Sequence, residues 1–311
     1  MILKEKMLSQ AVKNEVEYWQ FTPLALAKAK EGMDHRAEEE IERIKGGEQL
    51  GNVHEQAVRD YQQLSELIAG GMQFLGSCRK LDNARDWKAV DMGSGTGVGA
   101  TIISQYDQFQ KIWAVEFSEN FVTDIMPEVF AYFKAKSEKI IRVVGDFNHL
   151  ELEDGSLDLI LDIDSFHHSE DLPTTLQECY RTLRPGGVIM AVDRAWEDHY
   201  SQLELDTMLD RELNDKLKKK YNIPEGTSFT RRDFGEHEYT LSQWFKAFSQ
   251  AGFETLVFSQ IHPPHLNSIF LKLPTFKFTI ALDTLLYRLG KRRLPVYGFN
   301  KTRRLFLAFK K

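Results

Sequence analysis

The sequence predicts an α/β fold with a mostly parallel central sheet and helices on both of its faces. From residue 87 onward, short apolar runs alternate with amphipathic stretches, the pattern that crossover helices between parallel strands produce. A glycine-rich turn at 93–99 follows the first of these runs, as expected where a strand turns sharply into a helix. Hydrophobic residues make up 42% and charged residues 28% of the 311 residues, which excludes disordered and fibrous classes.

Each element of this alternation is expected from its own pattern. Short apolar runs predict strands at 87–92, 111–117, 140–146, 157–164, 186–193 and 268–273. Amphipathic stretches predict helices at 97–109, 118–135, 171–183 and 240–252. Residues 1 to about 70 are expected to be helical, with a break at Gly46-Gly47 and apolar residues at helical spacing from Val53 to Ile68.

We expect three regions in the chain: a helical N-terminal cap over residues 1–69, a ligand-binding core over 70–273 and a C-terminal tail over 274–311. The core is interrupted at 195–237 by an insertion that carries a highly charged helix at 203–221. Ligands of such sheets bind beyond the carboxyl ends of the strands. The cap and the insertion are both expected to cover that edge, with the insertion as a substrate lid.

The C-terminal tail is strongly basic. From Lys272 to Lys311, eleven Lys and Arg stand against one acid, Asp283, a net charge of +10, so the other residues must carry −16 to give the overall −6. An amphipathic helix is predicted within the tail, with one apolar stripe from Phe278 to Leu289. Three interpretations stay open: the stripe packs on the chain's own core or on a second subunit of a homodimer, it lies on an anionic membrane surface, or the tail binds an anionic acceptor. The acidic body argues against nucleic acid as a partner.

The cysteines and the N-terminal stretch indicate the cellular setting. Cys78 and Cys179 show neither the spacing of metal ligands nor a disulfide framework, so we expect a reduced compartment and no metal site. The charged N-terminal stretch lacks the apolar run of a signal peptide, and no apolar run approaches the ~18–20 residues of a membrane span. We therefore expect a cytoplasmic protein, in peripheral contact with a membrane if the tail binds lipid.

The glycine-rich turn, DMGSGTGVGA at 91–100, fits two kinds of cofactor loop. Glycines after a strand let the backbone approach a ligand closely, and the next helix offers its N-terminal amides. A dinucleotide fingerprint can be read as Gly95-x-Gly97-x-x-Ala100. The other pattern is an acid followed by alternating glycines, Asp91-x-Gly93-x-Gly95-x-Gly97. The turn by itself does not separate the two.

Downstream motifs decide between them. Residues from about 70 to 273 resemble the class I S-adenosylmethionine-dependent methyltransferases, because motifs of that family occur here in its order. DMGSGTG at 91–97 resembles the first motif, Glu116 in WAVEFSE the acid that ends the second strand, and GDF at 145–147 the adenine-binding motif. LDLILDIDSFHHSED at 157–171 resembles the fourth strand with its active-site exit, and RTLRPGGVIMAVD at 181–193, the most specific motif, leads into the fifth strand.

This resemblance implies a Rossmann-like seven-stranded sheet, S-adenosylmethionine as cofactor and S-adenosylhomocysteine as product. It implies that Glu116 binds the ribose hydroxyls and that Asp146 binds the exocyclic amine of adenine. Phe117 and Phe147 are expected as apolar walls beside the purine, and Asp91 as an acid that orients the turn. The residues expected to form the cofactor site are Asp91, Gly93, Ser94, Gly95, Thr96, Gly97, Glu116, Phe117, Asp146, Phe147 and Asp162.

The acceptor site is expected at the ends of the fourth and fifth strands. In methyl transfer from a sulfonium the protein aligns the acceptor and, for a hydroxyl or a protonated amine, removes a proton. Histidine is the first candidate for the base because it titrates near neutrality. The catalytic candidates are His167, His168, His199 and Asp193. The alternative for the histidine pair is to close the turn between strand and helix.

We expect a methyltransferase that acts on an oxygen or nitrogen atom of a small-molecule or glycan-type acceptor. An RNA or protein methyltransferase and a catalytically silent S-adenosylmethionine-binding scaffold are the alternatives. Asp164-Ser165-Phe166-His167 stands where an Asn-Pro-Pro-Tyr-type motif would favour chemistry on base amines. The intact glycine turn and Glu116 disfavour the silent scaffold.

Overall fold

The computed structural model describes eight stretches of the chain. They are residues 16–23, 42–43, 45–48, 55–78, 86–220, 223–224, 226–258 and 303–311. The predicted strand at 268–273, the stripe at 278–289 and Val53 lie outside these residues.

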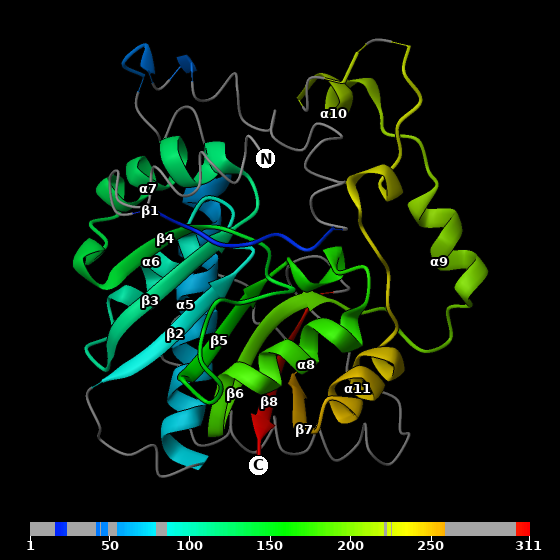
Figure 1. The fold of residues 1–311 in the computed structure, drawn as a ribbon. Coiled ribbons are helices and arrows are strands. Elements are labelled where there is room, and N and C mark those ends of the chain that lie inside the picture. Colours follow the sequence, from blue (N-terminus) through cyan, green and yellow to red (C-terminus); the bar gives the residue numbers. More distant parts are fainter. Residues whose placement is uncertain are drawn as a thin grey trace.

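A single sheet of eight strands forms the centre of the described structure (Figure 1). Its order is β1-β4-β3-β2-β5-β6-β8-β7. The strands are β1 (Val16–Tyr18), β2 (Trp87–Met92), β3 (Phe109–Glu116), β4 (Ile140–Val144), β5 (Leu157–Ile163), β6 (Leu183–Arg194), β7 (Phe253–Phe258) and β8 (Arg303–Lys310). Every neighbouring pair is parallel except those of β8, which is antiparallel to both β6 and β7. The predicted α/β, Rossmann-like class is confirmed. The sheet has eight strands where seven are expected: β2 to β6 correspond to predicted strands, whereas β1, β7 and β8 fall outside the predicted ranges.

Helices cover both faces of the sheet (Figure 1). The helices and helical turns are α5 (Glu55–Cys78), α6 (Val98–Ser104), η2 (Phe121–Ile125), α7 (Met126–Tyr132), η3 (Ser137–Lys139), η4 (Phe166–His168), α8 (Leu172–Thr182), α9 (Gln202–Leu209), α10 (Asp215–Lys220), η5 (Arg232–Phe234) and α11 (Leu241–Gln250). Helices α5, α6 and α7 contribute to one apolar cluster, and α8 and α11 contribute to the other. The two clusters lie on opposite faces of the sheet.

The strands read as continuous apolar runs because both faces are buried. Neighbours along β2 point to opposite faces: Ala89 belongs to the cluster beneath α5, and Val90 belongs to the cluster beneath α8. Leu159 and Ile160 divide in the same way on β5, and all four side chains are fully buried. Such strands lack the polar–apolar alternation of a sheet with one wet face.

The N-terminal region differs from the helical cap that the sequence predicts. Val16–Tyr18 forms β1, which pairs in parallel with Arg142–Val144 at the edge of the sheet. A three-residue strand is too short to give a periodic signal in the sequence. Helix α5 runs from Glu55 to Cys78, so the expected boundary at 69/70 falls inside one helix.

The insertion also differs in detail from the prediction. The single charged helix expected at 203–221 is two short helices, α9 and α10, with a break between them. The Asn214 side chain accepts a hydrogen bond from the Leu217 amide at 3.0 Å, and the Leu213 amide bonds to the Phe229 carbonyl at 2.9 Å. A short polar side chain that caps a new helix favours this break, since it satisfies an amide that lacks an intrahelical partner.

The end of the chain is a core strand, which corrects the prediction of an accessory tail for these residues. Strand β8 lies between β6 and β7, and residues 304–309 are buried. Arg304 is 1% exposed and donates from Nη2 to Glu197 Oε1 at 2.9 Å. Lys310 Nζ donates to the backbone carbonyls of Tyr180 and Leu183 at 2.6 and 2.7 Å. At least two of the tail's cations therefore serve the fold.

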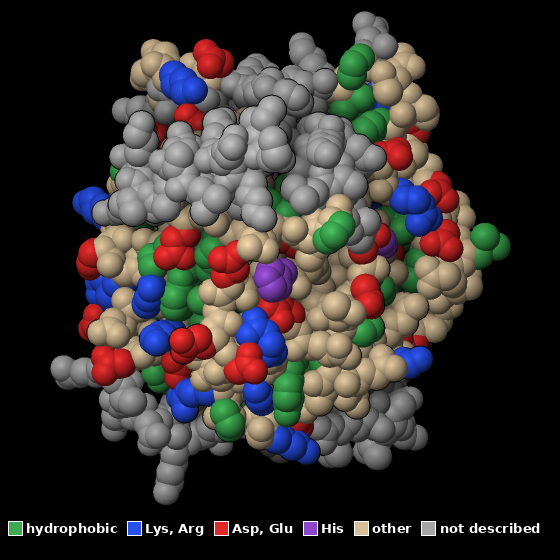
Figure 2. Space-filling model, in the orientation of Figure 1, with side chains coloured by type: hydrophobic (Ala, Val, Ile, Leu, Met, Phe, Trp, Pro, Cys, Tyr) green, Lys and Arg blue, Asp and Glu red, His purple; other side chains and the backbone are tan. Residues whose placement is uncertain are grey.

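The described surface shows mixed charge. In Figure 2, acidic and basic side chains are interspersed over the described part of this face, and hydrophobic side chains occur in small groups. None of the helices in the described ranges is both long enough and apolar enough to cross a membrane.

Candidate active site

The glycine turn after β2 has the backbone shape that requires glycine. Gly93, Gly95 and Gly97 have φ values of 60°, 52° and 81°, in the left-handed region that side chains disfavour. A Cβ at Gly93 would lie 2.4 Å from the Ser165 Cβ, and one at Gly97 would lie 2.6 Å from the Phe130 ring. A Cβ at Gly95 would meet nothing within 4 Å. The turn is thus packed at its two ends and open at its middle glycine.

Asp91, which is expected to orient this turn, bonds to the start of the helix that follows it. Its side chain is 1% exposed, and Oδ2 accepts a hydrogen bond from the Ala100 amide at 2.7 Å, in the first turn of α6. Burial raises the pKa of Asp91 to about 7, against the lowering effect of that hydrogen bond, and the nearby Glu116 raises it further. The carboxyl group therefore fixes the start of the helix and does not face the open side of the turn.

Glu116, the last residue of β3, lies against the open middle of the turn. Its Oε2 accepts a hydrogen bond from the Gly95 amide at 2.8 Å, and its Oε1 accepts one from the Ser118 amide at 3.0 Å. Two backbone donors from different loops thus hold the half-buried carboxylate. Strands β2 and β3 are parallel neighbours, so their carboxyl ends bring these loops together.

Asp146 follows β4 at the same edge and is held by four donors. Oδ1 accepts from the Asn148 amide and side chain at 2.8 and 2.7 Å. Oδ2 accepts from the amide and the hydroxyl of Thr22 at 3.2 and 2.6 Å. Phe117 and Phe147, the expected apolar walls, are half-buried nearby, and the ring of Phe21 lies edge-on to Phe117 at 5.3 Å. The sequence gives no signal for Phe21 or Thr22, which come from a segment more than 90 residues away.

Ser165 joins the exit of β5 to the glycine turn. Its hydroxyl bonds to the Met92 carbonyl at 2.5 Å and to Asp162 Oδ1. Asp162 is fully buried, and its Oδ1 also accepts from the amides of Ser165 and Phe166. Burial, reinforced by Asp193, raises the pKa of Asp162 well above its ordinary range. Asp162 thus holds the loop that carries the histidine pair, and Asp164 in this loop has a φ of 51°, a strained value for a residue with a side chain.

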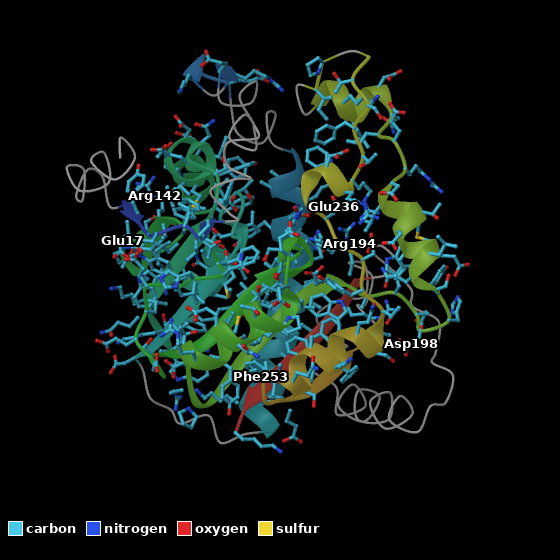
Figure 3. The ribbon with its side chains drawn as sticks, turned by 45° about the vertical axis from the view of Figure 1, so that its right-hand side comes forward. Glu17, Arg142, Arg194, Asp198, Glu236 and Phe253 are labelled. Carbon is cyan, nitrogen blue, oxygen red and sulfur yellow. The ribbon has the colours of Figure 1, made fainter. Side chains whose placement is uncertain are left out.

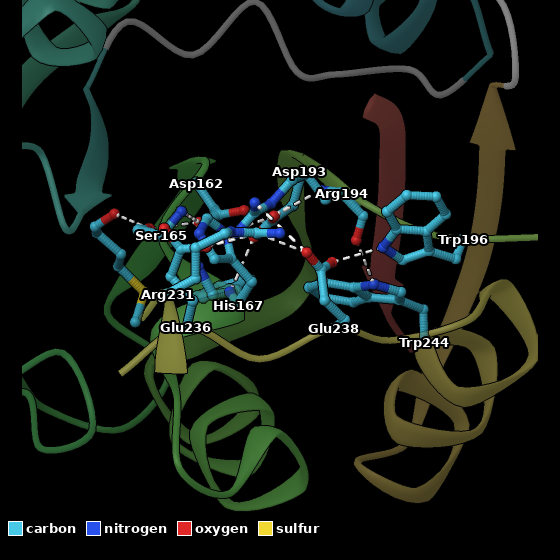
Figure 4. A network of polar contacts seen from close by, with 12 residues as sticks. Asp162, Ser165, His167, Asp193, Arg194, Trp196, Arg231, Glu236, Glu238 and Trp244 are labelled. Carbon is cyan, nitrogen blue, oxygen red and sulfur yellow. Dashed lines mark hydrogen bonds and ion pairs between the residues drawn. The ribbon is translucent and has the colours of Figure 1, made fainter. Parts of the chain in front are cut away.

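His167 and Asp193 form a buried dyad at the ends of β5 and β6 (Figure 4). The His167 Nδ1 lies 2.7 Å from Asp193 Oδ1, and the His167 amide donates to Asp193 Oδ2 at 3.0 Å. Both side chains are nearly excluded from solvent. An ionised carboxylate only accepts hydrogen bonds, so the proton between the two groups belongs on Nδ1 of the ring. Two of the four predicted catalytic residues are therefore brought together.

His168 and Glu236 lie next to this dyad. The ring centroids of His168 and His167 lie 4.3 Å apart with the planes tilted by 37°, and ligand atoms of His167, His168 and Glu236 lie within 4.8 Å of one another. Arg194 and Arg231 both donate to Glu236 Oε2, at 2.9 and 2.7 Å. Burial opposes ionisation of Glu236, but the two arginines outweigh it and hold its pKa below the ordinary value. Because these arginines neutralise the carboxylate, the set is a poor site for a metal cation.

An ionic cluster docks the insertion onto the end of β6 (Figures 3 and 4). Arg231 also donates to Glu238 Oε1 at 2.5 Å, and the Trp196 indole donates to Glu238 Oε2 at 2.6 Å. Glu238 is 3% exposed. The amide of His237 donates to the His167 carbonyl at 2.8 Å, so the returning end of the insertion lies directly against the dyad. The sequence gives no signal for Arg231, Glu236 or Glu238, because charged residues in a loop resemble solvated surface.

His199 is not brought into this cluster by any described contact. It is exposed, and its ring lies tilted beside that of Tyr200, with centroids 4.4 Å apart, in the loop that leads to α9. Of the four predicted catalytic residues, His199 thus lies in the least suitable environment for a base. The sequence could not distinguish the environments of the two histidines, since both His167 and His199 follow the end of a strand.

Comparison with known proteins identifies the central part of the chain. Residues 90–191 match the family model described as a methyltransferase domain. Malonyl-acyl-carrier-protein O-methyltransferase 1 of Coxiella burnetii is 34% identical over 101 residues, which are 32% of this chain and 31% of that protein. A sterol 24-C-methyltransferase of Aspergillus fumigatus is 25% identical over 169 residues, 54% of this chain and 40% of that protein. The chain therefore spans between about a third and two fifths of the length of these two relatives.

A solved structure shows the same fold. The protein from Galdieria sulphuraria assigned as a sarcosine dimethylglycine methyltransferase superposes with a TM-score of 0.51 at 21% identity, over 80% of this chain and 85% of that one. Three features indicate the same fold. They are the methyltransferase domain matched at 90–191, the strand order with its antiparallel β8, and the glycine turn after β2. Residues 90–191 thus carry a methyltransferase domain, and the described chain has the Rossmann-like fold of the class I S-adenosylmethionine-dependent type.

Proposed function

We propose that this chain transfers a methyl group from S-adenosylmethionine to an oxygen or nitrogen atom of a small-molecule or glycan-type acceptor by in-line displacement. The observation that carries the proposal is the buried His167–Asp193 dyad beside the glycine turn. Ser165, two residues before His167, touches the turn itself through its bond to the Met92 carbonyl. The cofactor loop and the dyad therefore share one rigid unit.

The residues at the carboxyl edge fit the cofactor. Gly95 faces open space, Glu116 offers a carboxylate beside it, and Phe117 and Phe147 offer apolar walls. The hydroxyls of Ser94 and Ser118 are buried and have no partner among the described residues, which leaves them to a ligand. We assign Glu116 to the ribose hydroxyls and Asp146 to the adenine amine. Gly93, Ser94, Gly95, Thr96 and Gly97 form the cradle, and Asp91 and Asp162 position it from beneath.

The chain's own contribution to the reaction is alignment and proton removal. When bound, S-adenosylmethionine supplies the electrophilic methyl group. Asp193 fixes the ring of His167 with Nδ1 protonated, so that Nε2 accepts the proton of an acceptor hydroxyl or ammonium. The carboxylate also stabilises the imidazolium that forms. The ring of His168 packs at a tilt beside this ring and restricts its rotation.

The acceptor class is proposed from the site and from what the relatives are named for. The chain resembles a malonyl-acyl-carrier-protein O-methyltransferase and, over 81 residues at 35% identity, a glycine/sarcosine/dimethylglycine N-methyltransferase of Actinopolyspora halophila. A dyad with a neutral imidazole suits either atom. The insertion 195–237 lies against the dyad through His237 and Glu236, so we propose it as the lid that keeps water from the acceptor.

Isotope transfer tests the proposal. The purified chain is incubated with S-adenosylmethionine carrying a labelled methyl group and with panels of small amines, hydroxy compounds, carboxylates and sugars. We expect label in at least one small-molecule panel together with release of S-adenosylhomocysteine. Binding of S-adenosylhomocysteine without transfer to any panel would favour the silent scaffold, and label only in added RNA or protein would favour that alternative.

A further inference from the structure

The segment that follows β1 crosses the edge of the sheet where the proposed adenine site lies (Figure 1). It is anchored at four points: the pairing of β1 with β4, the Trp19 amide on the Val144 carbonyl at 2.9 Å, the Gln20 amide on Glu151 Oε1 at 2.8 Å, and the Tyr18 hydroxyl on Glu119 Oε1 at 2.9 Å. Trp19 is 3% exposed. Residues 16–20 are thus a fixed part of the fold.

The next two residues contact the residues that we assign to adenine. The ring of Phe21 meets Phe117 at 5.3 Å with an interplanar angle of 87°. Thr22 donates to Asp146 Oδ2 from its amide at 3.2 Å and from its hydroxyl at 2.6 Å. One wall and the one acid of the proposed adenine site therefore both have protein partners from this segment.

Asp146 has no acceptor capacity to spare in this arrangement. A carboxylate offers about four lone-pair sites, and Asp146 accepts four hydrogen bonds, two from Asn148 and two from Thr22. An amine that approaches Asp146 must replace one of these donors. The Asn148 bonds close a turn within two residues, whereas the Thr22 hydroxyl is supplied by a distant segment and is the donor that a ligand can displace with the least rearrangement.

We propose that the Thr22 hydroxyl is a placeholder for the exocyclic amine of the cofactor. This inference rests on the proposed function and deepens it, since it adds a residue that controls cofactor affinity. In this structure Thr22 satisfies Asp146 and Phe21 covers Phe117; when the adenine enters, Phe21 and Thr22 move aside while residues 16–20 stay anchored. Binding of the cofactor therefore requires one charge-assisted hydrogen bond to break, which lowers the affinity for the cofactor.

Substitution of Thr22 tests this directly. Thr22→Val removes the hydroxyl and keeps the shape, Thr22→Ser restores the hydroxyl, and Thr207→Val is the matched control because Thr207 bonds to Leu203 on the exposed face of α9. Calorimetry gives the Kd of S-adenosylhomocysteine, and stopped-flow fluorescence of the tryptophans gives its association rate. S-inosylhomocysteine, which has an oxygen in place of the amine, is the comparison probe.

We expect Thr22→Val to bind S-adenosylhomocysteine about tenfold more tightly than the wild type, equivalent to about 1.4 kcal/mol, and to associate faster. Thr22→Ser and Thr207→Val should match the wild type, and S-inosylhomocysteine should gain little from Thr22→Val. Unchanged or weaker binding of S-adenosylhomocysteine by Thr22→Val, while the wild type binds it, overturns this inference and leaves the proposed function standing. Absence of binding by the wild type overturns both.

Discussion

The dyad of His167 and Asp193 makes a prediction that does not require the acceptor to be known. Asp193→Asn keeps the volume of a side chain that is fully buried, so it changes hydrogen bonding with little change in packing. In the wild type both carboxylate oxygens face donors: Oδ1 faces His167 Nδ1 at 2.7 Å and the Arg194 amide at 2.5 Å, and Oδ2 faces the His167 amide at 3.0 Å. We expect the substitution to disable the base.

The size of the effect follows from these three contacts. If the new amide group turns its oxygen to the ring, its NH₂ faces the His167 amide, and two donors oppose one another. If it turns the other way, its NH₂ donates to Nδ1 and drives the ring proton to Nε2, where it blocks the base. Either orientation leaves a buried donor unsatisfied or selects the wrong tautomer. The expected loss is about 1–3 kcal/mol of unfolding free energy and about 10²–10⁴-fold in kcat, with the affinity for S-adenosylmethionine unchanged.

Nitrogen-15 NMR of the histidine rings is the assay. We expect the His167 resonance of the wild type to show a protonated Nδ1 and an unprotonated Nε2, and the Asp193→Asn variant to lose that signature. His199→Asn is the control, because His199 is exposed and should leave the His167 resonances unchanged. A wild-type His167 with its proton on Nε2, or an Asp193→Asn variant with full turnover, would refute the assignment of the base.

Three further outcomes are expected. Gly93→Ala should lower the unfolding free energy by about 2–4 kcal/mol in urea titration, because its Cβ would overlap the Ser165 Cβ at 2.4 Å. The Cβ of Gly95→Ala would meet no atom within 4 Å, so this variant should lower the unfolding free energy by about 1–2 kcal/mol, from its positive φ alone. Burial raises the pKa of Asp91 from 3.8 to about 7, so the unfolded state releases this proton first as the pH rises. The stability of the wild type relative to Asp91→Asn should therefore be highest below pH 4 and fall, by on the order of 4 kcal/mol at most, up to pH 7 in denaturant titrations at each pH. Lys310→Met should lower the melting temperature, since two backbone carbonyls lose their donor; an unchanged melting temperature would show that these bonds contribute no stability.

The sequence predicts the centre of the fold well because periodicity reports burial. The strands at 87–92 and 157–163 and the helix at 172–182 agree with the expected ranges to within two residues, since each is a short apolar or amphipathic run with a sharp end. Strand β8 escaped the prediction because its sequence, RRLFLAFK, mixes cations with apolar residues. The buried position of Arg304 depends on its partner Glu197, more than 100 residues earlier.

The candidate site divides in the same way. Residues of the glycine turn and Glu116 could be placed from spacing, because adjacent parallel strands bring their ends together whatever the side chains do. Whether His167 or His199 meets Asp193 depends on the path of the loops, which local pattern does not encode. The contact of Thr22 with Asp146 depends on a three-residue strand at the sheet edge.

Calorimetric titration of the full chain with S-adenosylmethionine, paired with Glu116→Ala, tests the central claim most directly. We predict saturable one-to-one binding by the wild type and a loss of at least tenfold in affinity for the variant, whose turn has lost the carboxylate that holds the Gly95 amide. A wild type that shows no heat of binding at millimolar cofactor would contradict the account. So would a Glu116→Ala variant that binds the cofactor as tightly as the wild type.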